Sequence, residues 1–360
     1  MALALSLGRR GLGRVWPNPA VGCVIVGASG RILGRGVTAP GGRPHAEVQA
    51  LAQAGEAARG STAYVGLEPC AHHGKTPPCA EALVTAGVAR VVSAMEDPDP
   101  RVDGGGHAIL RKAGIEVVTG VLEAEARHDH IGFLTRITAG RPMVTLKLAT
   151  SLDGRIATAS GESQWITGPA ARRCVHGLRA AHDGVLVGGG TARADNPSLT
   201  VRGLGMRHQP VRIVAARHLD LPLNSALAAT AKDTPVWLCH GPDAATDRRA
   251  AWEAAGARLI EVPPGQDRQL SLASLLGALG AAGLTRIFCE GGGIFAAALL
   301  NADLVDRLEV FQAGLTLGAE GTPALGALGV DRLTEAPRFR LARVSAIGPD
   351  VVQSWERRSP

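Results

Sequence analysis

The first part of the chain alternates between two patterns of apolar and polar residues. Short apolar runs bounded by glycine and proline predict strands, whereas longer segments with apolar residues three or four positions apart predict helices. The predicted strands cover residues 22–26, 31–36, 63–66, 90–94 and 115–119, and the predicted helices cover residues 48–59, 80–86 and 107–113. The first two strands read as a hairpin. Strands that alternate with helices predict a three-layer α/β sandwich.

This pattern is interrupted after a further predicted helix, residues 123–135. The sequence Ala139-Gly140-Arg141-Pro142 contains glycine and proline, which end helices, and a new apolar strand occupies residues 143–149. More strands are predicted at residues 184–188, 211–214 and 286–289, followed by a helix at residues 294–300. A chain of 360 residues is too long for one ordinary core, so we expect two α/β domains, residues 1–141 and 142–360.

Composition narrows the class of protein. With 46% hydrophobic and 19% charged residues the chain is globular, and it contains no apolar run long enough to span a membrane. The N-terminus is apolar before it is basic, the reverse of a secretory signal, which predicts a cytoplasmic protein. Six irregularly spaced cysteines do not suggest a disulfide framework and fit a reducing compartment.

The net charge of +6 raises the question of a nucleic-acid partner. Only four of the 38 basic residues are lysine, and the arginines are scattered without a long run. Aromatic residues make up 3% of the chain, which leaves few rings on which bases would stack. We therefore predict no nucleic-acid partner and no membrane partner, and instead a phosphorylated small-molecule substrate.

Four residues in the first half carry the chemistry of a zinc hydrolase. A catalytic zinc takes three protein ligands and leaves a fourth position for water, and His45, Cys70 and Cys79 supply three suitable side chains. Glu47 lies two residues after His45 and is predicted to shuttle protons as the catalytic residue without binding the metal. The order H-x-E, then P-C and a second cysteine, is the signature of zinc nucleobase deaminases. Each residue alone is more often a packing residue, but the ordered set favours zinc.

Three glycine-rich segments are candidates for phosphate binding. Gly74-Lys75-Thr76 lacks the glycine that a P-loop requires five positions earlier, because Pro69 stands there. The run at residues 104–106 is interpreted as a flexible loop. Glu290-Gly291-Gly292-Gly293-Ile294 joins a strand to a helix, where free N–H groups stabilise pyrophosphate. Glycine-rich turns are also common without a ligand, and the ordered dinucleotide-binding spacing G-x-G-x-x-G is absent.

The two cysteine ligands are eight residues apart, and this spacing makes the resemblance specific. Residues 17–26, His45-Ala46-Glu47 and residues 68–79 resemble the deaminase half of the bifunctional riboflavin-biosynthesis deaminase and reductase, the RibD or RibG family. In the second half, residues 147–156, 161–167, 184–202 and 290–294 resemble its reductase half. The resemblance implies a cytidine-deaminase-like zinc domain followed by a dihydrofolate-reductase-like domain, with Zn²⁺ and NADPH as cofactors.

The same resemblance implies two sequential reactions and a set of contacts. The first domain would deaminate 2,5-diamino-6-ribosylamino-4(3H)-pyrimidinone 5′-phosphate, and the second would reduce 5-amino-6-(5-phosphoribosylamino)uracil with NADPH. It implies contacts to the pyrimidine substrate from Asn18, His72 and Lys75, contacts to NADPH from Ala149, Trp165, Thr191, Asp195, Gly292, Gly293 and Ile294, and contacts to the reductase substrate from Ser163, Arg179, Leu199, Arg202 and Glu290. It also suggests a homodimer or homotetramer.

Some assignments in the second domain remain open. Lys147 interrupts an apolar strand, so it is predicted to point into a cleft, and Lys147 and Glu290 are both candidate proton donors. Arg217 follows a predicted strand where the family usually carries an acidic or small polar pair, and it either favours the 2′-phosphate of NADPH or is solvated. The competing hypotheses are a zinc nucleoside or tRNA deaminase with an appended dinucleotide-binding domain and a regulatory protein with inactive remnants of both domains.

Overall fold

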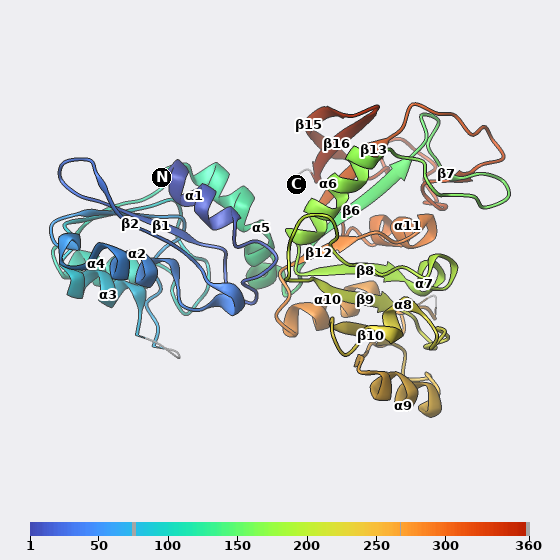
Figure 1. Cartoon of the computed structure of the whole chain (residues 1–360), viewed down its shortest axis with the longest axis horizontal. Helices are drawn as coiled ribbons and strands as arrows, with labels where there is room; N and C mark the ends of the chain where they lie inside the picture. Colours follow the sequence, from blue (N-terminus) through green and yellow to red (C-terminus); the bar gives the residue numbers. More distant parts are fainter. Residues whose placement is uncertain (74–76, 267, 358–360) are drawn as a thin grey trace. The chain divides into compact units, whose positions relative to one another are not determined.

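A computed structural model describes residues 1–73, 77–266 and 268–357 of the chain (Figure 1). The chain divides into two compact units, Met1–Gly140 and Arg141–Pro360. No helix in these described ranges combines the length and apolar character needed to cross a membrane.

The first unit is built on a five-stranded sheet in the order β2-β1-β3-β4-β5. Its strands are β1 (Gly22–Val26), β2 (Ile32–Val37), β3 (Thr62–Val65), β4 (Arg90–Ser93) and β5 (Glu116–Val118). β1 pairs antiparallel with β2 and β3, whereas β3, β4 and β5 run parallel. The hairpin and the alternation of strands and helices confirm the α/β architecture expected for this part of the chain.

Helices cover both faces of this sheet (Figure 1). They are α1 (Ala2–Arg9), α2 (Ala46–Ala54), α3 (Cys79–Ala86), α4 (Gly105–Lys112) and α5 (Glu123–Ala139), with short 3₁₀ turns η1 (Pro40–Gly42) and η2 (Gly55–Ala58). Strand glycines allow the helices to approach closely. A Cβ on Gly22 would lie 2.0 Å from the carbonyl oxygen of Ala4 in α1, and a Cβ on Gly36 would lie 1.9 Å from that of Ala46 in α2.

Several predicted boundaries in this unit were wrong. α2 begins at Ala46 and not at residue 48, so His45 is its N-cap, and it ends at Ala54 because Gly55 takes a positive φ of 56°. α5 continues to Ala139, four residues beyond the predicted end, and stops at Gly140 in the left-handed conformation. The glycine run at residues 104–106 is not a flexible loop, because Gly105 and Gly106 form the first turn of α4.

The second unit contains a nine-stranded sheet in the order β11-β10-β9-β8-β12-β6-β13-β16-β15. Strands from β11 to β13 in that order are parallel, and β16 and β15 add an antiparallel hairpin at one edge. These strands are β6 (Met143–Thr150), β8 (Gly184–Gly188), β9 (Val211–Ala215), β10 (Val236–His240), β11 (Arg258–Glu261), β12 (Arg286–Cys289), β13 (Arg307–Gln312), β15 (Phe339–Ile347) and β16 (Asp350–Arg357). β8 and β12 are buried along their whole length, as expected for central parallel strands.

The helices of the second unit follow the parallel strands in the usual βα alternation. They are α6 (Pro169–Ala180), α7 (Gly189–Asp195), α8 (Ala226–Ala229), α9 (Thr246–Ala255), α10 (Leu272–Ala281) and α11 (Gly293–Asn301), and a separate two-stranded sheet pairs β7 (Arg155–Ala157) with β14 (Thr322–Pro323). α7 and α11 start directly after the adjacent strands β8 and β12. Their N-termini therefore lie at the carboxyl edge of the sheet, where parallel α/β folds bind ligands.

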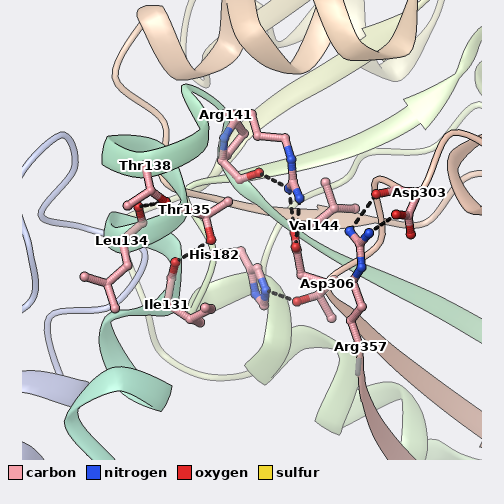
Figure 2. Close-up of polar contacts among 12 residues, drawn as sticks. Ile131, Leu134, Thr135, Thr138, Arg141, Val144, His182, Asp303, Asp306 and Arg357 are labelled. Atoms are coloured by element: carbon pink, nitrogen blue, oxygen red, sulfur yellow. Dashed lines mark hydrogen bonds and ion pairs between the residues drawn. The ribbon is translucent and has the colours of Figure 1, made fainter. Parts of the chain in front are cut away.

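A partly buried ion pair fixes the start of the second unit (Figure 2). The guanidinium of Arg141 donates to both carboxylate oxygens of Asp306 at 2.7 and 2.9 Å, and Asp306 also accepts the N–H of Val144 at 2.8 Å. In the same unit the ring of His182 lies 2.9 Å from Thr145 Oγ1. The Asp306 contacts tie the first residues of the unit to the segment that precedes β13, and the His182 contact ties β6 to the residues after α6.

Candidate functional site

The three predicted metal ligands lie together in the first unit. His45 is the N-cap of α2, Cys79 is the first residue of α3, and Cys70 lies in the loop after β3. Nδ1 of His45 is 3.3 Å from Cys79 Sγ and 3.6 Å from Cys70 Sγ, and the three ligand atoms lie within 4.8 Å of one another. Nitrogen and sulfur ligands of a tetrahedral zinc are about 3.5 Å apart, so the donor set fits this ion.

The two thiols shift each other's pKa in opposite directions. The hydrogen bond from Cys79 lowers the pKa of Cys70 to about 4, and the same contact raises the pKa of Cys79. The backbone N–H of Cys79 also donates to Cys70 Sγ at 3.3 Å, at the N-terminus of α3. A helix N-terminus stabilises a thiolate, as a bound divalent cation also would.

Glu47 lies beside the ligands and is 4% exposed. It is the second residue of α2, two residues after the His45 cap, and its carboxylate is within hydrogen-bonding reach of the Cys79 thiol. Burial and the negative charge of Cys70 raise the pKa of Glu47. A carboxyl group that keeps a proton more readily than usual is suited to proton transfer.

The three predicted contacts to the pyrimidine substrate are placed differently. Asn18 Nδ2 donates to the carbonyl of Gly42 at 2.8 Å and lies 3.2 Å from His45 Nε2, so Asn18 borders the metal ligands. Gly42 adopts a φ of 88°, and a Cβ there would lie 2.7 Å from the Asn18 side chain. His72 is half-buried, two residues after Cys70. Lys75 lies outside the described residues.

Sequence reasoning missed one buried carboxylate next to this cluster. Glu68, two residues before Cys70, is 3% exposed and accepts hydrogen bonds from four backbone N–H groups. The order Glu68-Pro69-Cys70 was visible in the sequence, but nothing in it showed which backbone groups the carboxylate would meet.

A second cluster of charged side chains lies in the second unit. Arg179 of α6 donates to both oxygens of Glu290 at 2.5 and 3.1 Å, and Lys147 Nζ of β6 is 3.9 Å from Glu290 Oε2. Burial acts to raise the pKa of Glu290, but the Arg179 and Lys147 charges outweigh it and lower the pKa. Burial also lowers the pKa of Lys147. The structure thus brings together Lys147, Arg179 and Glu290, three residues that were each predicted at the reductase site and lie far apart in the sequence.

The other predicted substrate contacts lie on the segments before α6 and after α7. Arg179 Nη1 also donates to the carbonyl of Thr200 at 2.8 Å, which joins this cluster to the segment of Leu199 and Arg202. Leu199 is buried, with a positive φ of 55°. Arg202 is exposed, and its guanidinium donates to Ser198 Oγ at 3.1 Å. Ser163 is exposed in the loop between β7 and α6.

The predicted NADPH contacts gather at two neighbouring strand-to-helix turns and on nearby segments. Thr191 of α7 accepts the N–H of Gly292 at 3.1 Å, which links the N-termini of α7 and α11. The first residues of α11 include Gly293, where a Cβ would lie 3.0 Å from the carbonyl oxygen of Ala324, and Ile294, which is 86% exposed. An apolar side chain this exposed at a glycine-rich helix N-terminus is consistent with a ligand surface.

The remaining predicted cofactor contacts are Ala149, Trp165 and Asp195. Ala149 is half-buried on β6, two residues after Lys147, and Asp195 is the last residue of α7. Trp165 is 66% exposed, and the Arg172 guanidinium lies 4.6 Å from its ring centroid. Arg217 is not simply solvated, because its guanidinium pairs with Asp243.

Comparison with known proteins covers both units. The family model described as the cytidine and deoxycytidylate deaminase zinc-binding region matches residues 1–95, and the model of the RibD C-terminal domain matches residues 142–353. The second match accounts for the part of the chain that a nucleoside or tRNA deaminase would leave unexplained.

Relatives match almost the whole length of the chain. The chain is 43% identical to the riboflavin biosynthesis protein RibD of Escherichia coli, over 98% of this chain and 96% of the relative, and 39% identical to that of Aquifex aeolicus, over 99% and 97%. Among solved structures, Acinetobacter baumannii RibD superposes with a TM-score of 0.89 at 39% identity and covers 99% of this chain and 98% of its own. A Thermotoga maritima deaminase/reductase superposes with a TM-score of 0.85 at 33% identity, covering 99% of this chain and 97% of its own. With full-length relatives at this level of identity and models that match both units, the chain belongs to the RibD family.

Proposed function

We propose that this chain catalyses both reactions named for its Thermotoga maritima relative, diaminohydroxyphosphoribosylaminopyrimidine deaminase and 5-amino-6-(5-phosphoribosylamino)uracil reductase. The observation that carries the proposal is the grouping of His45, Cys70 and Cys79 beside the buried Glu47, in a chain that matches RibD relatives from end to end. The C-terminal match to the RibD reductase domain supports the second activity.

The residues of the first unit divide the work of deamination. His45, Cys70 and Cys79 would hold zinc, which when bound supplies the Lewis acidity that makes water a nucleophile near neutral pH. Glu47 takes the proton of the attacking water and delivers it to the departing ammonia. The side-chain N–H of Asn18 donates to the carbonyl of Gly42, which fixes the Asn18 amide beside the metal ligands. The other polar atoms of this amide orient the pyrimidine ring.

In the second unit, NADPH supplies the hydride and the protein positions the two reactants. The N-termini of α7 and α11, linked by Thr191 and Gly292, offer backbone N–H groups to the cofactor's phosphates. Arg179 and Glu290 hold each other in one orientation facing Lys147. Lys147 carries a proton on a partly buried ammonium group with a lowered pKa, which suits it for proton donation during reduction.

The substrate class and the assembly of the protein are part of the same proposal. Arg202 is exposed and its guanidinium can bind phosphate oxygens with two parallel hydrogen bonds, which fits a phosphorylated pyrimidine. A homodimer or homotetramer is supported by exposed apolar side chains on the edge strand β15, where Leu341 and Val344 are 45% and 55% exposed. A cytoplasmic location fits an enzyme with two thiol ligands that must stay reduced.

The test begins with metal content and the two activities of the full-length protein. Purified protein should contain about one zinc per chain, release ammonia from the diaminopyrimidine phosphate, and oxidise NADPH when given the deaminated product. Cys70→Ser and Cys79→Ser should lose zinc and ammonia release but keep NADPH oxidation, whereas Cys174→Ser in α6 is the matched control and should change neither. Full zinc occupancy in both ligand variants would refute the ligand assignment.

We further propose that the two activities reside in separately folding parts divided near residue 141. The compact units Met1–Gly140 and Arg141–Pro360 support this boundary. A fragment that begins at Arg141 keeps the Arg141–Asp306 ion pair and should fold and oxidise NADPH without zinc. An unfolded fragment, or one whose reductase activity required zinc, would contradict the boundary.

A further inference from the structure

Four backbone N–H groups donate to the carboxylate of Glu68, and the ring of His107 lies 3.8 Å from it. Oε1 accepts from Gly106 at 2.9 Å and from His107 at 3.1 Å, and Oε2 accepts from Asp97 and Gly104 at 3.1 Å each. Three of these donors lie at the N-terminus of α4, where a negative charge is stabilised by the helix dipole. Glu68 therefore occupies a helix N-terminus that would otherwise be open to an anion.

The chain around Cys70 also packs tightly against the same helix. A Cβ on Gly106 would lie 1.9 Å from the carbonyl oxygen of Pro69, and a Cβ on Gly105 would lie 3.2 Å from the Cβ of Ala71. The first turn of α4 thus rests on the residues immediately before and after Cys70. These two glycines are needed for the approach, because any larger residue would push the segment away.

On its other side, Cys70 is bound by α3. The N–H of Cys79 donates to Cys70 Sγ at 3.3 Å, and the N–H of Ala80 donates to the carbonyl of Cys70 at 3.2 Å. Cys70 itself lies in neither a helix nor a strand. Its position is therefore set by two helix N-termini, α3 directly and α4 through Glu68.

A second metal site at Glu68 does not explain this arrangement. Ligand atoms of Glu68, Glu96 and His107 lie within 4.8 Å of one another. His107 Nδ1 lies 3.8 Å from Glu68 Oε1, and His107 Nε2 is paired with Ser93 Oγ at 2.9 Å. However, both oxygens of Glu68 already accept from two N–H donors each, and Glu96 is exposed. A cation there would have to displace hydrogen bonds that the fold itself provides.

We propose that Glu68 is a positioning residue that holds the loop of Cys70 on α4, so that Cys70 Sγ stays at ligand distance from His45 and Cys79. This inference rests on the proposed zinc site. Glu68→Gln tests it with nearly unchanged shape. An amide has one acceptor oxygen and one donor nitrogen. The glutamine must therefore leave one pair of N–H groups without an acceptor, either Gly106 and His107 or Asp97 and Gly104. The loop of Cys70 then loses half of its hydrogen bonds through residue 68.

The experiment uses the full-length protein loaded with cobalt(II) in place of zinc, because thiolate-to-cobalt absorption reports the ligand geometry directly. The rate of metal release to an excess of chelator is measured in parallel. Glu68→Gln should change the cobalt spectrum and release the metal about 10–100-fold faster, the range for residues that orient metal ligands. Ammonia release should fall through kcat, with little change in KM, and NADPH oxidation should be unchanged.

Asp183→Asn is the matched control. Asp183 is also a buried carboxylate bound by backbone N–H groups, those of Thr285 and Arg286 at 2.6 and 2.9 Å, but it lies in the second unit. This variant should lower the melting temperature of the protein while the cobalt spectrum and the release rate stay at wild-type values. A change in metal release of equal size in Asp183→Asn would reduce the Glu68 effect to general destabilisation and overturn the proposal.

The outcomes separate this inference from the proposed function. If wild-type protein shows no thiolate-to-cobalt absorption, the zinc site itself is wrong. If wild-type protein shows it and Glu68→Gln has the same spectrum and release rate, only the positioning role fails. If Glu68→Gln does not fold, Gly105→Ala tests the proposal in its place, because the added Cβ displaces Ala71 by a few tenths of an ångström. It should release metal faster than wild type, and an unchanged rate would overturn the proposal.

Discussion

Glu47 in the first unit is buried and Glu290 in the second is partly buried, and both are acids at candidate sites, yet their surroundings shift their pKa values in opposite directions. Burial and the negative Cys70 raise the pKa of Glu47. For Glu290, burial is outweighed by Arg179 and Lys147, and the pKa is lowered. The same side chain is therefore prepared to exchange a proton in one unit and to remain an anion in the other.

Neighbouring charges, more than burial, decide whether such a carboxyl group exchanges a proton or stays ionised. Glu47 borders the imidazole of His45 and two thiols whose own charges depend on a metal. Glu290 has permanent cations on α6 and β6. Glu47 thus suits chemistry with water, whereas Glu290 suits the orientation of a charged cluster. Four substitutions test this contrast.

Glu47→Gln should give the largest effect. It keeps the shape and removes the exchangeable proton, so ammonia release should fall by about 10²–10⁴-fold, while zinc content and NADPH oxidation remain at wild-type values. Glu56→Gln, on an exposed acid in the same unit, is the control and should keep full activity. Loss of zinc in Glu47→Gln would show that Glu47 is a ligand or a structural residue.

Glu290→Gln should act mainly on stability. It leaves Arg179 and Lys147 without their partly buried counter-charge, so the free energy of unfolding of the second unit should fall by about 3 kcal/mol. Urea unfolding followed by the loss of NADPH oxidation measures this effect, with exposed Glu320→Gln as the control. Unchanged stability would mean that Glu290 is not the fixed anion described above, and the contrast with Glu47 would fail.

Arg202→Ala should have a moderate and selective effect. If Arg202 binds the substrate phosphate, its loss removes a charge-assisted interaction of about 1.5–3 kcal/mol, which corresponds to a KM about 10–150-fold higher in the reductase reaction. Steady-state kinetics measures it, and Arg207→Ala, on an exposed arginine of the same segment, should leave KM unchanged. A fall in kcat at constant KM would place Arg202 in another role.

Asp97→Asn should act on the pH dependence of stability. Burial, together with Asp99 and Glu68, raises the pKa of Asp97 to about 7, although the N–H of Asp99 opposes this shift. The folded state then keeps a proton that the unfolded state releases, so stability falls between about pH 4 and pH 7, by up to about 1.4 kcal/mol per pH unit.

The asparagine variant lacks this proton and should lose that slope, which would make it more stable than wild type at pH 8 but not at pH 4. Urea unfolding of the first unit at the two pH values, with exposed Asp103→Asn as the control, provides the measurement. Equal pH dependence in wild type and Asp97→Asn would show that Asp97 ionises normally.

The sequence predicted the elements that depend on local pattern. The β1–β2 hairpin, the strands β8 and β12 and the first turn of α3 at Cys79 follow from apolar periodicity and from glycine and proline, which act over a few residues. Boundaries were less accurate where a single backbone angle decided them, as at Gly55, because a sequence does not show which glycine takes a positive φ. The ligand types were also readable, since only particular side chains bind zinc.

The tertiary structure alone decided which groups meet. Glu68 reaches backbone N–H groups 29 to 39 residues away, and Arg179 meets Glu290 across 111 residues. Arg179 had suggested a phosphate ligand, yet it is also half of a buried ion pair. The residue types that bind a metal or transfer a proton are a property of the sequence, because they depend on functional groups. The charge that each group carries depends on its neighbours, and only the packing of distant segments brings these neighbours together.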